Sequence, residues 1–170
     1  METDKTPLRR TKSVLLKALC DILRPVVSDL VVLDLFAGSG RVGRALLGEG
    51  ARRVFAVDLR SETTPRENVD WYCQEVESFL KFGPPEPVGL VFMDPPYDSG
   101  YPERILKQLA EVSWLEDNAI IAIETRANHP PLPEVVEDEF YLMRCRRYGG
   151  SKLWVYQAGR DEPVVEELED

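Results

Sequence analysis

The sequence is poor in the two residue types that most often bind metals or form cross-links. It has three cysteines, which lie far apart and form no CxxC pair, and a single histidine, His129. Because the cysteines are few and lie far apart, they argue against a zinc site and against a disulfide framework. His129 lies in a proline-rich loop signal and is given no role. We therefore expect no metal.

Long apolar runs are also missing. None approaches the roughly 20 residues that a membrane-spanning helix requires, and residues 1–10 are polar, with no apolar leader segment. We expect a cytoplasmic monomer with no membrane partner. The chain of 170 residues has the size of one domain. We expect that domain to span residues 1–160 and to be followed by a disordered tail at 161–170.

An excess of positive charge, usual in proteins that bind nucleic acid through phosphate contacts, is absent. The net charge is −9, and residues 161–170 carry six acids and no base, so the remainder carries −3. Residues 1–24 carry a local charge of +3. If the substrate is a nucleic acid, this balance predicts weak affinity for the naked form and reliance on a structured or protein-bound form.

Strand and helix patterns alternate along the chain. Apolar runs typical of buried parallel strands occur at 30–36, 53–58, 90–93 and 119–124, and 68–73 is a weaker strand. Helices are predicted at 11–23, 41–47 and 102–112. Segments 140–148 and 152–157 flank a Gly-Gly pair and predict a hairpin. The alternation predicts an α/β fold with a doubly wound, mostly parallel sheet and an antiparallel edge hairpin.

A glycine-rich turn indicates a nucleotide site. Residues 38–43 spell GxGxxG between a predicted strand and a helix, and Asp58 ends the next strand, where a carboxylate can hold ribose hydroxyls. A dinucleotide and S-adenosylmethionine both fit such a turn. Asp34 favours S-adenosylmethionine, because a carboxylate beside the turn repels a pyrophosphate and attracts a sulfonium and an ammonium. A nicotinamide-dependent oxidoreductase is the first alternative.

The segment Asp94-Pro95-Pro96-Tyr97 carries most of the functional inference. It follows a predicted buried strand and so lies at the carboxyl edge of the sheet, where ligands bind. Its prolines donate no backbone hydrogen bonds, so it presents two acceptors, the Asp94 carboxylate and the Pro95 carbonyl. These can hold both hydrogens of a nucleobase amino group and direct its nitrogen at a methyl sulfonium. Tyr97 offers a flat face for the base. The oxidoreductase alternative leaves this segment unexplained.

These segments resemble, in order, the RsmD family of bacterial methyltransferases of small-subunit ribosomal RNA, over residues 33–40, 55–58, 91–97, 122–124 and the 148–156 hairpin. The resemblance covers roughly residues 8–157. It implies a Rossmann-like class I methyltransferase fold and S-adenosylmethionine as cofactor. It also implies methylation of a guanine 2-amino group in 16S ribosomal RNA, naked or within an assembling small ribosomal subunit.

The resemblance and the charges give three sets of candidate residues. The catalytic set is Asp94, Pro95, Pro96 and Tyr97. The cofactor set is Asp34, Phe36, Gly38, Ser39, Gly40, Asp58, Leu59, Glu75 and Asp94, in which Glu75, or Gln74 beside it, replaces an aspartate usual in the family. The RNA-binding set is Arg9, Arg10, Lys12, Arg144, Arg146, Arg147 and Lys152, of which the first members are expected to precede the N-terminal helix.

The sequence departs from the family between Asp58 and Val69, where it has only ten residues and relatives have a full helix. A helix rises about 1.5 Å per residue, so there is room for a turn or two, and one sheet face near the adenine is expected to be exposed. Two further alternatives remain. One is an adenine or cytosine amino methyltransferase acting on DNA. The other is a non-catalytic relative that binds RNA or a protein.

Overall fold

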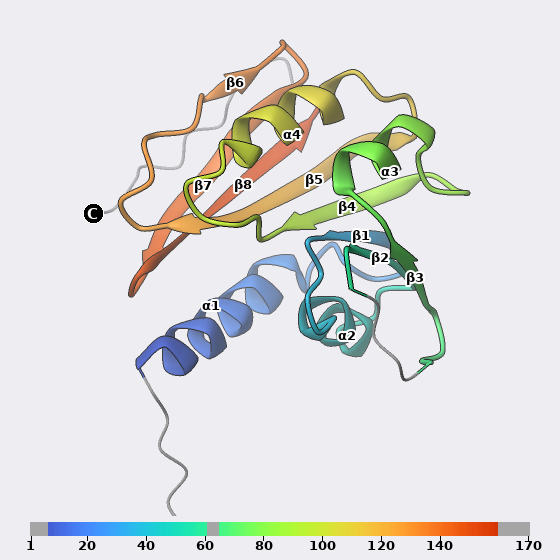
Figure 1. Ribbon diagram of the computed structural model, residues 1–170, viewed down its shortest axis with the longest axis horizontal. Coiled ribbons are helices and arrows are strands. Elements are labelled where there is room, and N and C mark those ends of the chain that lie inside the picture. Colours follow the sequence, from blue (N-terminus) through green and yellow to red (C-terminus); the bar gives the residue numbers. More distant parts are fainter. Residues whose placement is uncertain (1–6, 61–64, 160–170) are drawn as a thin grey trace, which may run out of the picture.

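The computed structural model describes residues 7–60 and 65–159, and side chains from residue 12 onward. Within these residues the chain forms one eight-stranded sheet in the order β3-β2-β1-β4-β5-β8-β7-β6 (Figure 1). Strands β1 to β5 run parallel, and β8, β7 and β6 continue the sheet antiparallel. The strands are β1 Val31–Leu35, β2 Arg53–Asp58, β3 Val69–Cys73, β4 Val88–Met93, β5 Leu115–Arg126, β6 Val135–Val136, β7 Phe140–Tyr148 and β8 Ser151–Ala158.

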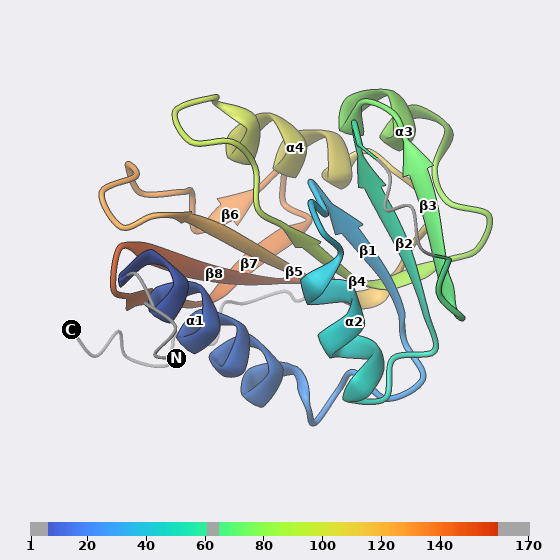
Figure 2. The same ribbon diagram turned by 60° about the horizontal axis from the view of Figure 1, so that its bottom comes forward.

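Helices cover both faces of the sheet. Helices α1 (Pro7–Leu23) and α2 (Arg41–Gly48) lie on one face, and α3 (Val76–Phe82) and α4 (Tyr101–Ala110) lie on the other, as Figures 1 and 2 show from two directions. The predicted α/β fold, doubly wound with an antiparallel hairpin, is therefore confirmed. None of the helices in the described part of the chain is long and apolar enough to span a membrane.

The strands supply two hydrophobic cores because successive side chains point to opposite faces. In β1, Val31, Leu33 and Leu35 pack toward α3 and α4, whereas Val32 packs toward α1 and α2. Burying each such side chain contributes about 1.5–3 kcal/mol. The same alternation determines which polar side chains at the carboxyl ends of the strands face α1 and α2. These side chains form the site described below.

Several element boundaries differ from those predicted. Helix α1 begins at Pro7, so Arg9 and Arg10 belong to it and do not precede it. Proline suits this first turn because its missing N–H would have no partner within the helix. Helix α3 was not predicted, since its seven residues are too few for a clear helical period. Strand β5 starts at Leu115, earlier than the predicted start at residue 119. Its first part was missed because residues 116–118 are polar and do not look like part of a buried strand.

The shortened connection after Asp58 contains no helix in its described residues, 59–60 and 65–68. Strand β3 has no fully buried residue, and its Trp71 side chain packs against the glycine turn. A Cβ atom added to Gly40, which has φ of 75°, would lie 2.8 Å from Trp71 Cζ2. Only glycine therefore fits there, both for its backbone conformation and for the contact with Trp71.

A candidate active site at the carboxyl edge of the sheet

A cavity of about 370 Å³ opens where β1, β2 and β4 end. Eight of the predicted catalytic and cofactor residues line it: Phe36, Asp58, Leu59, Glu75, Asp94, Pro95, Pro96 and Tyr97. Gln74, Val76 and Tyr101 complete its wall together with Lys12, which the sequence suggested for RNA binding. The rings of Phe36 and Tyr101 contact each other at 5.1 Å between centroids. The cavity thus combines carboxylates with an apolar, partly aromatic wall.

Asp58 connects this cavity to the glycine turn. Its Oδ2 accepts a hydrogen bond from the Gly38 N–H at 2.9 Å, and its Oδ1 accepts one from the Arg60 N–H at 3.0 Å. A carboxylate has about four acceptor positions, so these bonds fix its orientation and leave capacity for a ligand hydroxyl. Gly38, Ser39 and Gly40 do not line the cavity themselves, and Gly38 acts on it through Asp58.

Asp34 lies beneath the turn and not on the cavity wall. It is 1% exposed, and its Oδ2 accepts a hydrogen bond from the Gly43 N–H at 3.2 Å. Burial raises the pKa of Asp34 to about 7, with smaller contributions from the Asp94 and Asp58 charges. In this structure Asp34 joins the end of β1 to helix α2, so any effect it has on a ligand passes through the turn.

The Asp94–Tyr97 segment leaves β4 directly into the cavity. The Ser99 hydroxyl donates a hydrogen bond to the Pro96 carbonyl and closes this loop. Burial, and to a smaller extent the nearby Glu124 charge, raise the pKa of the Asp94 carboxyl against the opposing Lys12 charge, and the result is a pKa of about 7. A carboxyl that titrates near neutral pH can both accept hydrogen bonds and take up a proton.

A second cavity, of about 410 Å³, borders the first and shares Lys12 and Tyr97 with it. Three cations, Lys12, Arg126 and Arg147, lie in its wall, and none of its lining residues is acidic. The Arg126 guanidinium lies 4.4 Å above the centre of the Tyr97 ring. Arg126 was not among the predicted site residues. Its position on the ring shows that one face of Tyr97 already takes part in a cation–π contact.

Glu124 is a second residue whose position the sequence did not reveal. It is 5% exposed, and its Oε1 accepts a hydrogen bond from the Ser151 hydroxyl at 3.0 Å. The register pairs Met93 of β4 with Ile123 of β5, so Asp94 and Glu124 follow side by side on neighbouring parallel strands. In the sequence Glu124 is an acid at the end of a predicted buried strand and part of the 122–124 match to the family, and it was given no role.

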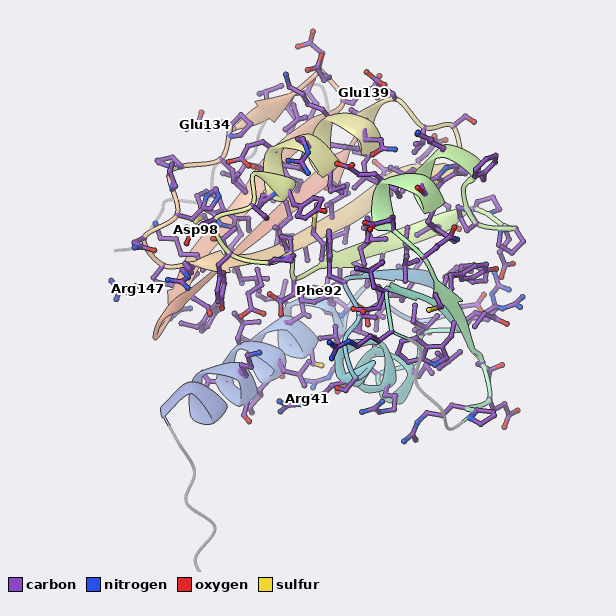
Figure 3. All side chains as sticks on the ribbon, viewed as in Figure 1. Arg41, Phe92, Asp98, Glu134, Glu139 and Arg147 are labelled. Atoms are coloured by element: carbon purple, nitrogen blue, oxygen red, sulfur yellow. The ribbon has the colours of Figure 1, made fainter. Side chains whose placement is uncertain are left out.

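Four of the predicted RNA-binding residues lie in the closing hairpin: Arg144, Arg146, Arg147 and Lys152. Figure 3 shows Arg147 at the outer end of β7. The cations of Arg146 and Lys152 lie over the rings of Tyr148 and Trp154, at 5.8 Å and 5.6 Å from the centroids. Arg144 lies on β7. The backbones of Arg9 and Arg10 are in α1, and their side chains lie outside the described residues.

Comparison with known proteins identifies the family. The sequence profile of the family described as Conserved hypothetical protein 95 matches residues 2–157. The chain belongs to this family. It is 29% identical over 163 residues to Ribosomal RNA small subunit methyltransferase D of Haemophilus influenzae, covering 88% of this chain and 83% of the relative. The protein of the same name in Escherichia coli K12 is 29% identical, over 76% of this chain and 71% of its own length.

Solved structures agree with this assignment to the RsmD-like family. The crystal structure of a provisionally assigned methylase from Haemophilus influenzae matches with a TM-score of 0.72 and 26% identity, and the match covers 88% of this chain and 99% of the other chain. A provisionally assigned methyltransferase of Escherichia coli matches with a TM-score of 0.71 and 26% identity, over 86% and 85% of the two chains. The predicted family and the Rossmann-like methyltransferase fold are both confirmed.

Proposed function

We propose that this protein is an S-adenosylmethionine-dependent methyltransferase of ribosomal RNA that modifies the 2-amino group of a guanine in 16S ribosomal RNA. One observation carries the proposal. The Asp94–Tyr97 segment separates a cavity that has Asp58 in its wall from a cavity that is lined by three cations and no acid. The names of the relatives, which are small-subunit ribosomal RNA methyltransferases, support the substrate class.

The residues of the first cavity suit S-adenosylmethionine. Asp58 stands at the end of β2, where a carboxylate can accept hydrogen bonds from ribose hydroxyls. Glu75 and Gln74 offer acceptors for an adenine amino group, and Leu59 and Val76 offer apolar contacts for its ring. Asp94 adds a carboxylate to the cavity wall, which would favour a ligand that carries a sulfonium. When bound, the cofactor supplies an electrophilic methyl group.

The protein's part in the chemistry is to position the amino group and to manage one proton. The Asp94 carboxylate and the Pro95 carbonyl would each accept a hydrogen bond from one N–H of the amino group, so its nitrogen would gain tetrahedral character and direct its lone pair at the methyl group. As the nitrogen–carbon bond forms, one nitrogen proton must leave. Asp94, with a pKa of about 7, accepts that proton and passes it to water.

The second cavity is the proposed entrance for the RNA. Lys12, Arg126 and Arg147 neutralise backbone phosphates around the target nucleotide, and Tyr97 stacks on its base. Because the net charge of the chain is −9, we propose that the substrate is RNA shaped by an assembling small subunit in the cytoplasm. The site is built from one chain, so a monomer suffices.

Mass spectrometry of ribosomal RNA nucleosides from cells that lack this protein tests the proposal. We expect the amount of 2-methylguanosine in 16S RNA to fall by one residue per molecule. Re-expression of the wild-type chain should restore it, and re-expression of Asp94→Ala should not. Loss of a methylated adenosine or cytidine, with 2-methylguanosine unchanged, would disprove the guanine assignment.

A further inference from the structure

Two carboxyl groups, those of Asp94 and Glu124, lie on neighbouring strands beside the segment that is proposed to hold the base, and each lines a pocket that Pro95, Pro96 and Tyr97 share. Phe92 of β4 and Ala122 of β5 both pack toward α1 and α2, and Figure 3 shows Phe92 on that side of the sheet. Strand side chains alternate, so Asp94 and Glu124, each two residues further on, point to the same side. The register that pairs Met93 with Ile123 makes them neighbours across the strands.

Glu124 is held at this place by its surroundings. Ser151, which lines the cation-rich second cavity, donates its hydroxyl hydrogen to Glu124 Oε1 at 3.0 Å. Glu124 lines a smaller pocket of about 70 Å³ together with Pro95, Pro96 and Tyr97, and through Ser151 it is one hydrogen bond from the cation-rich cavity. Its side chain is 5% exposed. The Lys12 charge acts on both carboxyls and lowers the pKa of each, against burial, which raises the pKa of each. A carboxylate has about four acceptor positions, and the Ser151 hydroxyl fills one of them, so Glu124 keeps capacity for the hydrogen-bond donors of a ligand.

Nucleobases differ in the ring nitrogen beside their reactive amino group. In guanine this nitrogen, N1, carries a hydrogen, so the N1–H and the 2-amino group form a row of donors. In adenine and cytosine the corresponding nitrogen, N1 or N3, presents a lone pair. Two adjacent carboxylates match the row of donors, whereas they repel a lone pair at the second place. A site built to hydrogen-bond one group rejects an analogue that lacks it by large factors.

We propose that Glu124 determines specificity for guanine by accepting the N1–H of the target base while Asp94 holds the neighbouring amino group, with Ser151 as its positioning residue. This inference rests on the proposed function and adds the residue that would select guanine. It also accounts for a buried acid at the end of β5 that the methyl transfer itself does not require.

The test uses 2,6-diaminopurine, which keeps the 2-amino group but presents a lone pair at N1. Small-subunit particles are reconstituted with 16S RNA that carries either guanine or diaminopurine at the target, and kcat/KM is measured with the full chain at pH 8.5. For the wild type we expect a preference for guanine of at least about 100-fold. In Glu124→Gln the amide N–H can donate to the diaminopurine N1, so we expect this preference to fall at least about tenfold.

Glu116→Gln is the matched control, since Glu116 lies exposed at the far end of the same strand. We expect it to keep the wild-type preference. Ser151→Ala removes the hydrogen bond that positions Glu124, and it should lower the preference for guanine about threefold, as expected for one modest hydrogen bond. If Glu124→Gln fails to bind S-adenosylhomocysteine, Ser151→Ala takes its place as the test variant. A wild-type preference in the variant that binds S-adenosylhomocysteine would overturn the role of Glu124. Methylation of adenine but not guanine by the wild type would instead overturn the proposed function.

Discussion

The two halves of the carboxyl edge of the sheet are built differently. In the half formed by β1 to β3, backbone N–H groups hold the acids: Gly38 donates to Asp58 and Gly43 to Asp34. In the half formed by β4, β5 and β8, side chains hold one another, as in the Ser151–Glu124 hydrogen bond and the Arg126–Tyr97 contact. We call them the cofactor half and the base half. The cofactor half is formed by one continuous stretch of the chain, whereas the base half is assembled from segments that lie far apart in the sequence.

This difference assigns different consequences to substitutions in each half. Fixed backbone donors and an orienting carboxylate act on binding, so changes in the cofactor half should alter affinity for the cofactor. Asp94, Glu124 and the cations around Tyr97 are the residues proposed to contact the reacting base, so changes there should alter rate and specificity. Substitutions in each half therefore test whether binding and chemistry are divided in this way.

Asp94→Ala should separate the halves most strongly. Its contact with the amino group strengthens toward the transition state, so we expect methyl transfer to slow by at least about 100-fold. Asp94→Asn should also slow transfer, because its NH₂ would face another donor and its charge is lost. Single-turnover methylation with radiolabelled cofactor measures this. Affinity for S-adenosylhomocysteine should change little, and a wild-type rate in folded Asp94→Ala would favour a non-catalytic binder.

Asp58→Ala is the counterpart in the cofactor half. It removes the acceptor for ligand hydroxyls and the anchor of the Gly38 N–H, so we expect S-adenosylhomocysteine to bind more weakly by about 1.5–3 kcal/mol. Isothermal titration calorimetry provides the measurement. At saturating cofactor the methylation rate should stay within a few-fold of the wild type. Unchanged affinity would remove Asp58 from the site.

The pH dependence of methylation should report the base half. Transfer needs the ionised Asp94 carboxylate, and burial beside Glu124 raises the pKa of Asp94 to about 7, whereas Lys12 lowers it. The rate should therefore fall about tenfold for each pH unit below 7 and level off above it. Lys12→Met should move the midpoint to higher pH, because the stabilising positive charge is gone. A rate that is flat from pH 5.5 to 8.5 would exclude Asp94 as the proton acceptor.

The smallest effect is expected for the cations of the second cavity. Replacing Arg126 and Arg147 with Ala should weaken RNA binding a few-fold and lower the slope of log affinity against log salt by about 2 if each contacts one phosphate. Fluorescence anisotropy across a salt titration measures both quantities. Arg66→Ala, on the β2–β3 connection, should leave the slope unchanged. Equal slopes in all three proteins would place the RNA elsewhere.

The contrast between the halves also explains what the sequence could predict. The cofactor half and the Asp94–Tyr97 segment are each formed by a single stretch of the chain. Their residue types and spacing therefore indicate both where the site lies and what chemistry it can perform. Glu124 and Arg126 gain meaning only from the β4–β5 register and from the loop that brings Tyr97 to Arg126, which no local pattern contains.

The same limit applied to the fold. Long apolar runs predicted the strands of the parallel sheet, whereas helix α3 has seven residues and depends on its packing against the sheet. Asp34 stands next to the glycine motif in sequence, yet the side of β1 on which it lies places it under α2 and away from the cavity.

The most direct test of the account is to identify the product made by the purified protein. Small subunits from cells that lack this protein are incubated with the wild type and methyl-labelled S-adenosylmethionine, and the RNA is digested and analysed by mass spectrometry. We predict that the label appears in 2-methylguanosine, at about one residue per 16S RNA at completion, and that Asp94→Ala transfers at most a few per cent of this amount in the same time, as a roughly 100-fold slower rate requires. Label in adenosine or cytidine, or equal labelling by Asp94→Ala, would contradict the account.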